Sequence, residues 1–147
     1  GAAFYLNDNP VIALSLRYDR IDAFWFTLMH EIAHIILGHS ASLDNDIYGS
    51  EESEQINISQ DEIEANKLAQ SWLVDTNALQ AFVRATKPYL SQTEIVNFAH
   101  KLNRHPGIVL GQLQKVGEVG YQHLRKLLVK VKPHIEQWID VSGPAAA

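Results

Sequence analysis

The sequence predicts an α+β fold that is mostly helical, with a small N-terminal β-sheet and a long apolar helix carrying the candidate active site. Two observations lead there: a strand–turn–strand pattern at the start, and then a series of helical segments bounded by capping residues. The 147 residues are 46% hydrophobic and 20% charged, which suits one globular domain with its own core. We therefore expect a single domain over residues 1–147, with about 1–3 and 143–147 disordered or left from expression.

The first elements follow from local patterns. Residues 4–6 and 11–16 read as strands separated by a turn of Asn, Asp, Asn and Pro. The poor alternation of the second strand predicts burial on both faces. Residues 23–37 should form a helix, with Asp22 as N-cap and Gly38 as its C-terminal stop. Most of its side chains are apolar, so we expect this helix to be buried.

The rest of the chain is predicted to be helical after one loop. Residues 40–57 are polar and acidic and read as a loop. Helices are expected over residues 60–75, 77–86, 93–102, 108–114 and 121–131, the third of them introduced by the capping box of Ser91 and Glu94. Pro133 should break the last helix.

The pentapeptide His30-Glu31-Ile32-Ala33-His34 lies inside the predicted helix of residues 23–37. Side chains four residues apart share a helix face, so both imidazoles can approach one metal ion. Zinc suits them because it binds neutral imidazole nitrogens and can leave one position open to water. Glu31 lies about 100° around the helix from His30, where its carboxylate can act as general base. The pattern predicts a hydrolytic zinc site; the competing interpretation is ordinary helix packing.

A third ligand must come from another segment, and residues 60–75 offer Glu62 and Glu64. Glu62 projects about 60° from the centre of the predicted buried face, and Glu64 about 100° away on the other side. Asn66, one helical turn after Glu62, could hold the Glu62 carboxylate. We choose Glu62 as the ligand and keep Glu64 as the alternative. A capping box of Ser59 and Glu62 is the non-metal interpretation.

Three segments together carry a family resemblance. They read FWFTLMHEIAHIILGH at residues 24–39, EIEANKLA at 62–69 and HPGIVLGQLQ at 105–114. They resemble the ImmA/IrrE family of metallopeptidases, in particular the branch linked to HigA-type antitoxins. The resemblance spans about residues 11–114 and implies a zincin-like (Glu-zincin) fold, with zinc on His30, His34 and the helix Glu, and with Glu31 as base. It also implies a protein substrate, typically a transcriptional repressor.

The sequence departs from the family pattern in places. Leu68-Ala69 replaces a usual Phe-Ala, and Val74-Asp75-Thr76 stands where a Pro normally closes the helix. Family members often carry a helix-turn-helix domain, which is missing before this segment, so we expect an excised or stand-alone domain.

An oxyanion formed during peptide hydrolysis needs a donor besides the metal. His105 is our first choice because it lies in a predicted turn. The other candidates are Tyr121, His123, His100 and His39.

Charge and composition limit the partners and the location. Residues 21–66 contain ten acidic residues and no Lys or Arg, which would favour a cation and oppose nucleic acid. The chain has no Cys, no secretory signal pattern and no segment suited to spanning a membrane. We expect a cytoplasmic protein without direct nucleic-acid or membrane binding. The family resemblance implies that it acts on a helix-turn-helix repressor or a toxin–antitoxin component.

Two other functions stay open. One is a zinc-bearing interaction or sensor domain that binds a regulator without cutting it. The other is a DNA-binding module, because residues 93–102 and 107–114 with their short turn mimic a helix-turn-helix. The second of these helices is largely apolar, so a packed helix pair is the interpretation we favour.

Overall fold

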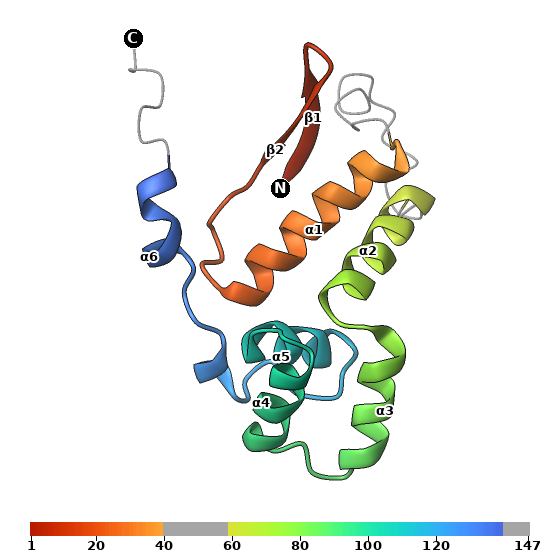
Figure 1. Cartoon of the computed structure of the whole chain (residues 1–147), viewed down its shortest axis with the longest axis vertical. Helices are drawn as coiled ribbons and strands as arrows, with labels where there is room; N and C mark the ends of the chain where they lie inside the picture. Colours follow the sequence, from red (N-terminus) through yellow and green to blue (C-terminus); the bar gives the residue numbers. More distant parts are fainter. Residues whose placement is uncertain (40–58, 140–147) are drawn as a thin grey trace, which may run out of the picture.

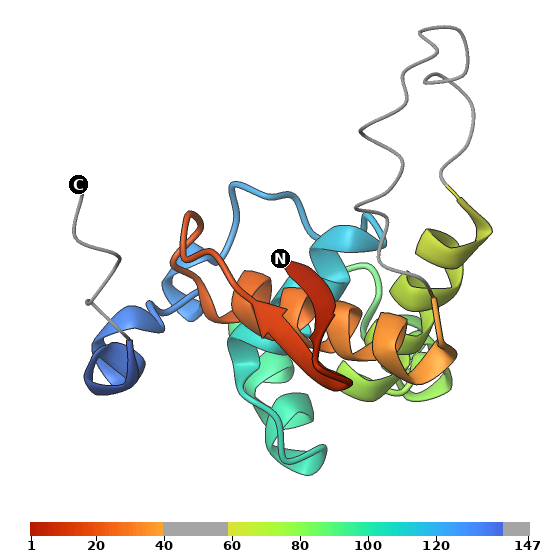
Figure 2. The ribbon, with the colours of Figure 1, turned by 90° about the horizontal axis from the view of Figure 1, so that it is seen from above.

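The computed structural model describes residues 1–39 and 59–139, and confirms the mostly helical α+β class. A two-stranded antiparallel hairpin lies along one side of α1, and α2 lies along another (Figure 1; Figure 2). The predicted loop of residues 40–57 and the predicted loose end at 143–147 lie outside the described residues. The elements are β1 (Ala2–Leu6), β2 (Asn9–Ala13), α1 (Ile21–Leu37), α2 (Gln60–Leu73), α3 (Thr76–Thr86), α4 (Gln92–Lys101), α5 (Pro106–Lys115), η2 (Arg125–Leu127), α6 (Lys132–Ile135) and η3 (Glu136–Trp138).

The hairpin forms at the predicted turn, with shifted ends. Asn7 and Asp8 take φ values of 48° and 64°, the left-handed conformations that a two-residue hairpin turn requires and that Asn and Asp tolerate. Ala2 pairs with Ala13 at the open end, so residues 2–3 belong to β1, in the part of the chain where we expected disorder or residues left from expression. The second strand ends at Ala13 instead of residue 16. None of its residues is fully buried, so the prediction of burial on both faces is also wrong.

Helix α1 matches the predicted span but begins two residues earlier. Its N-cap is Arg20, and Asp22 lies in the first turn, where its carboxylate accepts hydrogen bonds of 3.0 and 3.1 Å from the Arg20 guanidinium. The predicted burial is only partly correct. Glu31 and Ala33 are buried, whereas Ile36 is 64% exposed. The apolar run therefore reflects a helix covered on some sides only, by the hairpin, α2 and α5.

Side-chain caps set the boundaries of the next helices close to their predicted positions. Ser59 caps α2 and Asp75 caps α3, while Ser91 and Glu94 form the predicted capping box of α4. At the other end of α2, Arg104 donates from its guanidinium to the carbonyl oxygens of Leu73 and Trp72, at 3.0 and 3.3 Å. This contact ties the turn before α5 to the end of α2 and satisfies two terminal carbonyls.

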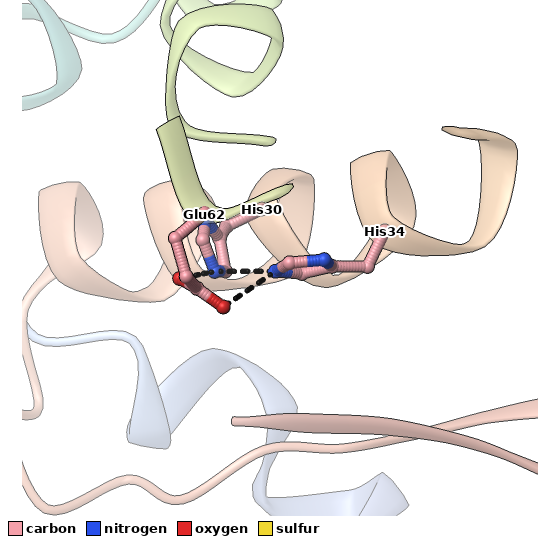
Figure 3. A group of neighbouring side chains, drawn as sticks. All are labelled: His30, His34 and Glu62. Carbon is pink, nitrogen blue, oxygen red and sulfur yellow. Dashed lines mark hydrogen bonds and ion pairs between the residues drawn. The ribbon is translucent and has the colours of Figure 1, made fainter. Parts of the chain in front are cut away.

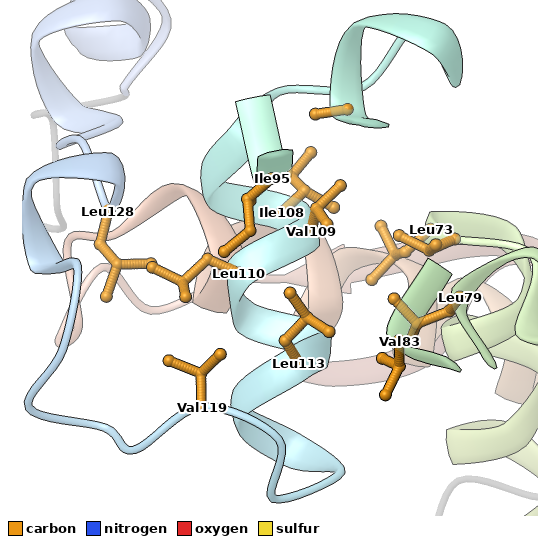
Figure 4. Packing of buried hydrophobic residues seen from close by; sticks show 12 residues of the cluster. Leu73, Leu79, Val83, Ile95, Ile108, Val109, Leu110, Leu113, Val119 and Leu128 are labelled. Carbon is orange, nitrogen blue, oxygen red and sulfur yellow. The ribbon is translucent and has the colours of Figure 1, made fainter. Parts of the chain in front are cut away.

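Helix α5 lies in the hydrophobic core (Figure 4). Every residue from Gly107 to Gln114 is buried, and Leu110 and Leu113 are fully covered. The surrounding residues come from α2, α3, α4 and the segment after α5. Because no face of α5 is free to enter a major groove, the burial argues against the helix-turn-helix alternative.

The segment after α5 differs from the prediction. Instead of a helix over residues 121–131, the chain forms only the 3-10 turn η2, preceded by Leu124 at a φ of 56°. Pro133 does not break a helix; it lies in the first turn of α6, where its missing N–H leaves no intrahelical bond unmade. None of the helices that the structure describes is long and apolar enough to cross a membrane.

Candidate metal centre

Three predicted ligands meet between α1 and α2 (Figure 3). The Nε2 atoms of His30 and His34 lie 3.0 Å apart. From the first turn of α2, Glu62 places one carboxylate oxygen 3.2 Å from Nε2 of His30 and the other 3.1 Å from Nε2 of His34. Two imidazoles four residues apart on one helix and a carboxylate from the next helix thus point at the same small volume.

The donor set and its spacing fit zinc. Two atoms bound to a tetrahedral zinc at its usual bond lengths lie about 3.3 Å apart, close to the three separations in this group. Two neutral imidazoles and one carboxylate make a three-ligand set of the kind found in catalytic sites, where the fourth position stays open. The side chain of Glu62 is 44% exposed, while those of His30 and His34 are 15% and 16% exposed, so the group is reachable from the Glu62 side.

The two glutamates of α2 are separated as their helical angles predict. Glu64 does not join the group; its carboxylate accepts a hydrogen bond of 2.8 Å from Gln60. Ser59 Oγ accepts from the backbone N–H of Glu62 at 3.3 Å, so one half of the predicted capping box exists. The Glu62 side chain, however, turns to the histidines. Capping by Ser59 and contact with the histidines are therefore compatible, because they use different atoms of Glu62.

His30 is enclosed by side chains of α1 and its neighbours. Burial lowers the pKa of His30, and the negative charge of Glu62 acts in the opposite direction. Its ring stacks on Phe26, with centroids 6.0 Å apart. Asn66, which we expected to hold Glu62, neighbours the His30 ring instead. Nδ1 of His30 is buried and has no hydrogen-bond partner within the described residues.

Glu31, the predicted base, lies on α1 between the two histidines in sequence. It is the only buried acidic residue in the described parts of the chain, at 7% exposure. The backbone of Gly1, just before β1, lies against its carboxylate: a Cβ added to Gly1 would fall 2.7 Å from Oε1 of Glu31. Gly1 therefore covers part of the Glu31 carboxylate, which is largely out of solvent.

His39 contacts the group in a way that the sequence did not reveal. Its Nδ1 lies 3.0 Å from Nδ1 of His34, on the side of that ring away from Glu62. We had considered His39 only as an oxyanion donor. Gly38 is the sequence signal that could have indicated this contact. A Gly in the left-handed conformation reverses the chain after a helix and brings the next residue back against the last turn of that helix.

Helices α1 and α2, which carry the candidate site, lie in the part of the chain that matches a known protein family. A family model described as the IrrE N-terminal-like domain, a peptidase family, matches residues 1–111, which is well over half of the chain. The chain belongs to the ImmA/IrrE family. The match includes both helices that carry the group of His30, His34 and Glu62. No curated protein and no solved structure shows significant similarity to the chain.

The structure does not bring His105 into the metal centre of this ImmA/IrrE domain. His105 is the N-cap of α5, and its Nδ1 accepts a hydrogen bond of 2.9 Å from the N–H of Gly107. Gly107 packs against Ile21, at the start of α1. Ile21 is nine residues before His30, which is about 14 Å along the axis of α1.

Three of the other four predicted oxyanion donors, Tyr121, His100 and His123, are also placed elsewhere. Tyr121 is 60% exposed in the segment after α5, and His100 is exposed in the last turn of α4. His123 lines an open hollow of about 730 Å³ together with residues 87–92 of the α3–α4 connection. The structure therefore does not bring these three side chains to the candidate metal centre of His30, His34 and Glu62.

Proposed function

We propose that this domain is a zinc-dependent peptidase that hydrolyses a peptide bond in a protein substrate. The observation that carries the proposal is the convergence of His30, His34 and Glu62 at tetrahedral spacing, with Glu31 beside them on α1. Membership of the ImmA/IrrE peptidase family supports it independently of the geometry. A Glu-zincin-like arrangement, in which the helix that follows supplies the third ligand, is part of the proposal.

The chain's own residues have distinct roles in this proposal. His30 and His34 each offer Nε2, and the Glu62 carboxylate completes the set from α2. When bound, zinc activates water as a nucleophile and polarises the scissile carbonyl. Glu31 would serve as the base that takes a proton from the attacking water and passes it to the leaving amine. Gly1 lies against the Glu31 carboxylate and leaves it only 7% exposed.

The substrate class comes from the family resemblance. We propose a transcriptional repressor or an antitoxin as the substrate, cut in an accessible segment. The outer edge of β2 has no strand partner within the described residues, and an extended peptide could pair with its backbone. Asp61 and Glu64 on α2, beside His39, favour a substrate segment with positive charge.

Metal content tests the ligand set. We expect about one zinc per chain by elemental mass spectrometry, lost in His34→Ala and in Glu62→Gln because each removes one ligand. Glu64→Gln is the matched comparison, since it removes a carboxylate two residues away and should keep one zinc per chain. Loss of zinc in Glu64→Gln alone would assign the third ligand to Glu64 instead.

Peptide hydrolysis tests the reaction. The zinc-loaded protein is incubated with a peptide library, and new N-termini are identified by mass spectrometry. We expect cleavage by the wild type and a loss of at least about a hundredfold in Glu31→Gln, which keeps its zinc but has no base. Full zinc occupancy with no cleavage by the wild type would identify a zinc-bearing interaction domain instead.

A further inference from the structure

The turn that ends α1 fixes His39 against His34. Gly38 takes a φ of 68°, and its N–H bonds to the carbonyl of Ile35 at 3.2 Å. The N–H of His39 bonds to the carbonyl of His34 at 3.0 Å. This pair of bonds is the Schellman arrangement, which tightens the chain reversal at a helix end. The His39 backbone is thus tied to the residue whose ring its own side chain contacts.

The contact between the two rings requires a defined proton. With Nδ1 atoms 3.0 Å apart, one nitrogen must donate and the other accept. If Nε2 of His34 is a metal ligand, as the proposed function requires, it carries no proton. The neutral His34 ring then has its proton on Nδ1 and donates it, and Nδ1 of His39 is the acceptor.

The surroundings of Nε2 of His39 are consistent with a hydrogen bond donated by His34 and accepted by His39. With Nδ1 as acceptor, the proton of the neutral His39 ring lies on Nε2. That nitrogen faces two carboxylates in the first turns of α2, Oδ1 of Asp61 at 3.7 Å and Oε2 of Glu64 at 3.8 Å. The His39 side chain is only 10% exposed. Both carboxylates favour an N–H directed toward them, which leaves Nδ1 free to accept from His34.

We propose that His39 is a positioning residue for the metal centre: it accepts the Nδ1 proton of His34, directs His34 Nε2 to the metal, and connects that ring to Asp61 and Glu64 on α2. The inference rests on the proposed zinc site. The same turns of α2 carry Glu62, so one short stretch supplies both a ligand and the groups that orient another ligand. His30 differs from His34: its buried Nδ1 has no hydrogen-bond partner within the described residues, and Asn66 lies beside its ring.

Zinc affinity, measured by competition with a chromophoric chelator, tests the role of His39. We expect His39→Phe, which keeps an aromatic ring but has no acceptor, to bind zinc about ten- to a hundredfold more weakly than the wild type. His39→Asn should recover most of the affinity, because its carbonyl oxygen can accept the same proton. His100→Phe is the control, an exposed histidine replaced in the same way.

Two further readouts separate positioning from a general loss of structure. The visible absorption of the cobalt-substituted protein should shift in His39→Phe, while the melting temperature without metal stays close to that of His39→Asn. In the zinc-loaded wild type, nitrogen NMR of the imidazoles should show the proton of His34 on Nδ1 and that of His39 on Nε2. This measurement needs no variant to fold.

The outcomes distinguish the two proposals. Wild-type affinity in His39→Phe, or a proton on Nδ1 of His39 in the zinc-loaded protein, overturns the role of His39 and leaves the proposed function intact. Absence of zinc binding by the wild type overturns both.

Discussion

His105 caps the N-terminus of α5 in its neutral form. Its Nδ1 accepts the N–H of Gly107, and burial lowers its pKa. The unfolded chain therefore binds a proton more readily than the folded chain, near the ordinary pKa of about 6.5. The stability that His105 contributes is present above this pH and is lost as the pH falls through the lower folded pKa.

Urea unfolding with a chelator present tests this role. At pH 7.5, His105→Ala should lose about 1 kcal/mol, because one helix N-cap is removed. His105→Asn, which caps without titrating, should match the wild type at pH 7.5 and exceed it at pH 5. The capping role fails if the difference between His105→Asn and the wild type does not change with pH.

The residues of the metal centre differ in how far the sequence could predict them. His30, Glu31 and His34 follow from spacing on one helix, and Glu62 was distinguished from Glu64 by angle alone. His39 could not be assigned in this way, because its contact depends on the left-handed Gly38 and the resulting turn. The prediction of a turn at His105 did not include that a histidine before a Pro can also begin a helix, as it does here at the N-cap of α5.

At the level of elements, α5 packs against the first half of α1, from Asp22 to Phe26. Gly111 makes the close approach possible: a Cβ there would lie 2.5 Å from Cβ of Asp22. The half of α1 that carries His30 and His34 is then available to the hairpin and α2. The crossing of α1 and α5 thus determines which side of α1 can carry the metal centre.

Gly111→Ala should destabilise the domain by about 1–3 kcal/mol, because the two helices must separate to admit the methyl group. That cost exceeds the gain of about 0.5–1 kcal/mol from replacing a helical Gly with Ala. A double-mutant cycle with Asp22→Gly in denaturant unfolding checks the cause. The added cost of Gly111→Ala should shrink when Asp22 is Gly, and an unchanged cost would place the strain elsewhere.

Helices that begin at a local cap could be predicted from the sequence. The helix expected over residues 121–131 does not form, and this difference has a physical reason. The caps Ser59, Asp75 and Ser91 place the starts of α2, α3 and α4 within one residue of the predicted starts. The helix predicted over residues 121–131 fails because its end is bound by distant groups. Oδ1 of Asp19 accepts the N–H groups of Val131 and Lys132 at 2.8 and 2.9 Å, and Ile21 donates to Val129. Partners more than a hundred residues away leave no signal in the local sequence.

On the scale of the whole molecule, the candidate metal centre joins two helices that residues 40–58 separate in sequence. Two of its side chains come from α1 and one from α2, so a bound ion would hold the two helices together. An ion that binds the folded state and not the unfolded state adds stability by mass action, about 2.7 kcal/mol at a hundredfold excess over Kd.

Thermal unfolding should therefore depend on zinc. For a chain of this size, that added stability raises Tm by roughly 5–10 °C, and a chelator should reverse the rise. Glu62→Gln should lose most of the zinc-dependent increase, because α2 no longer contributes a ligand. Glu136→Gln, which removes an exposed carboxylate in η3, should respond to zinc as the wild type does. An equal zinc response in Glu62→Gln would mean that the ion does not join α1 to α2, and that the two histidines bind it without the second helix.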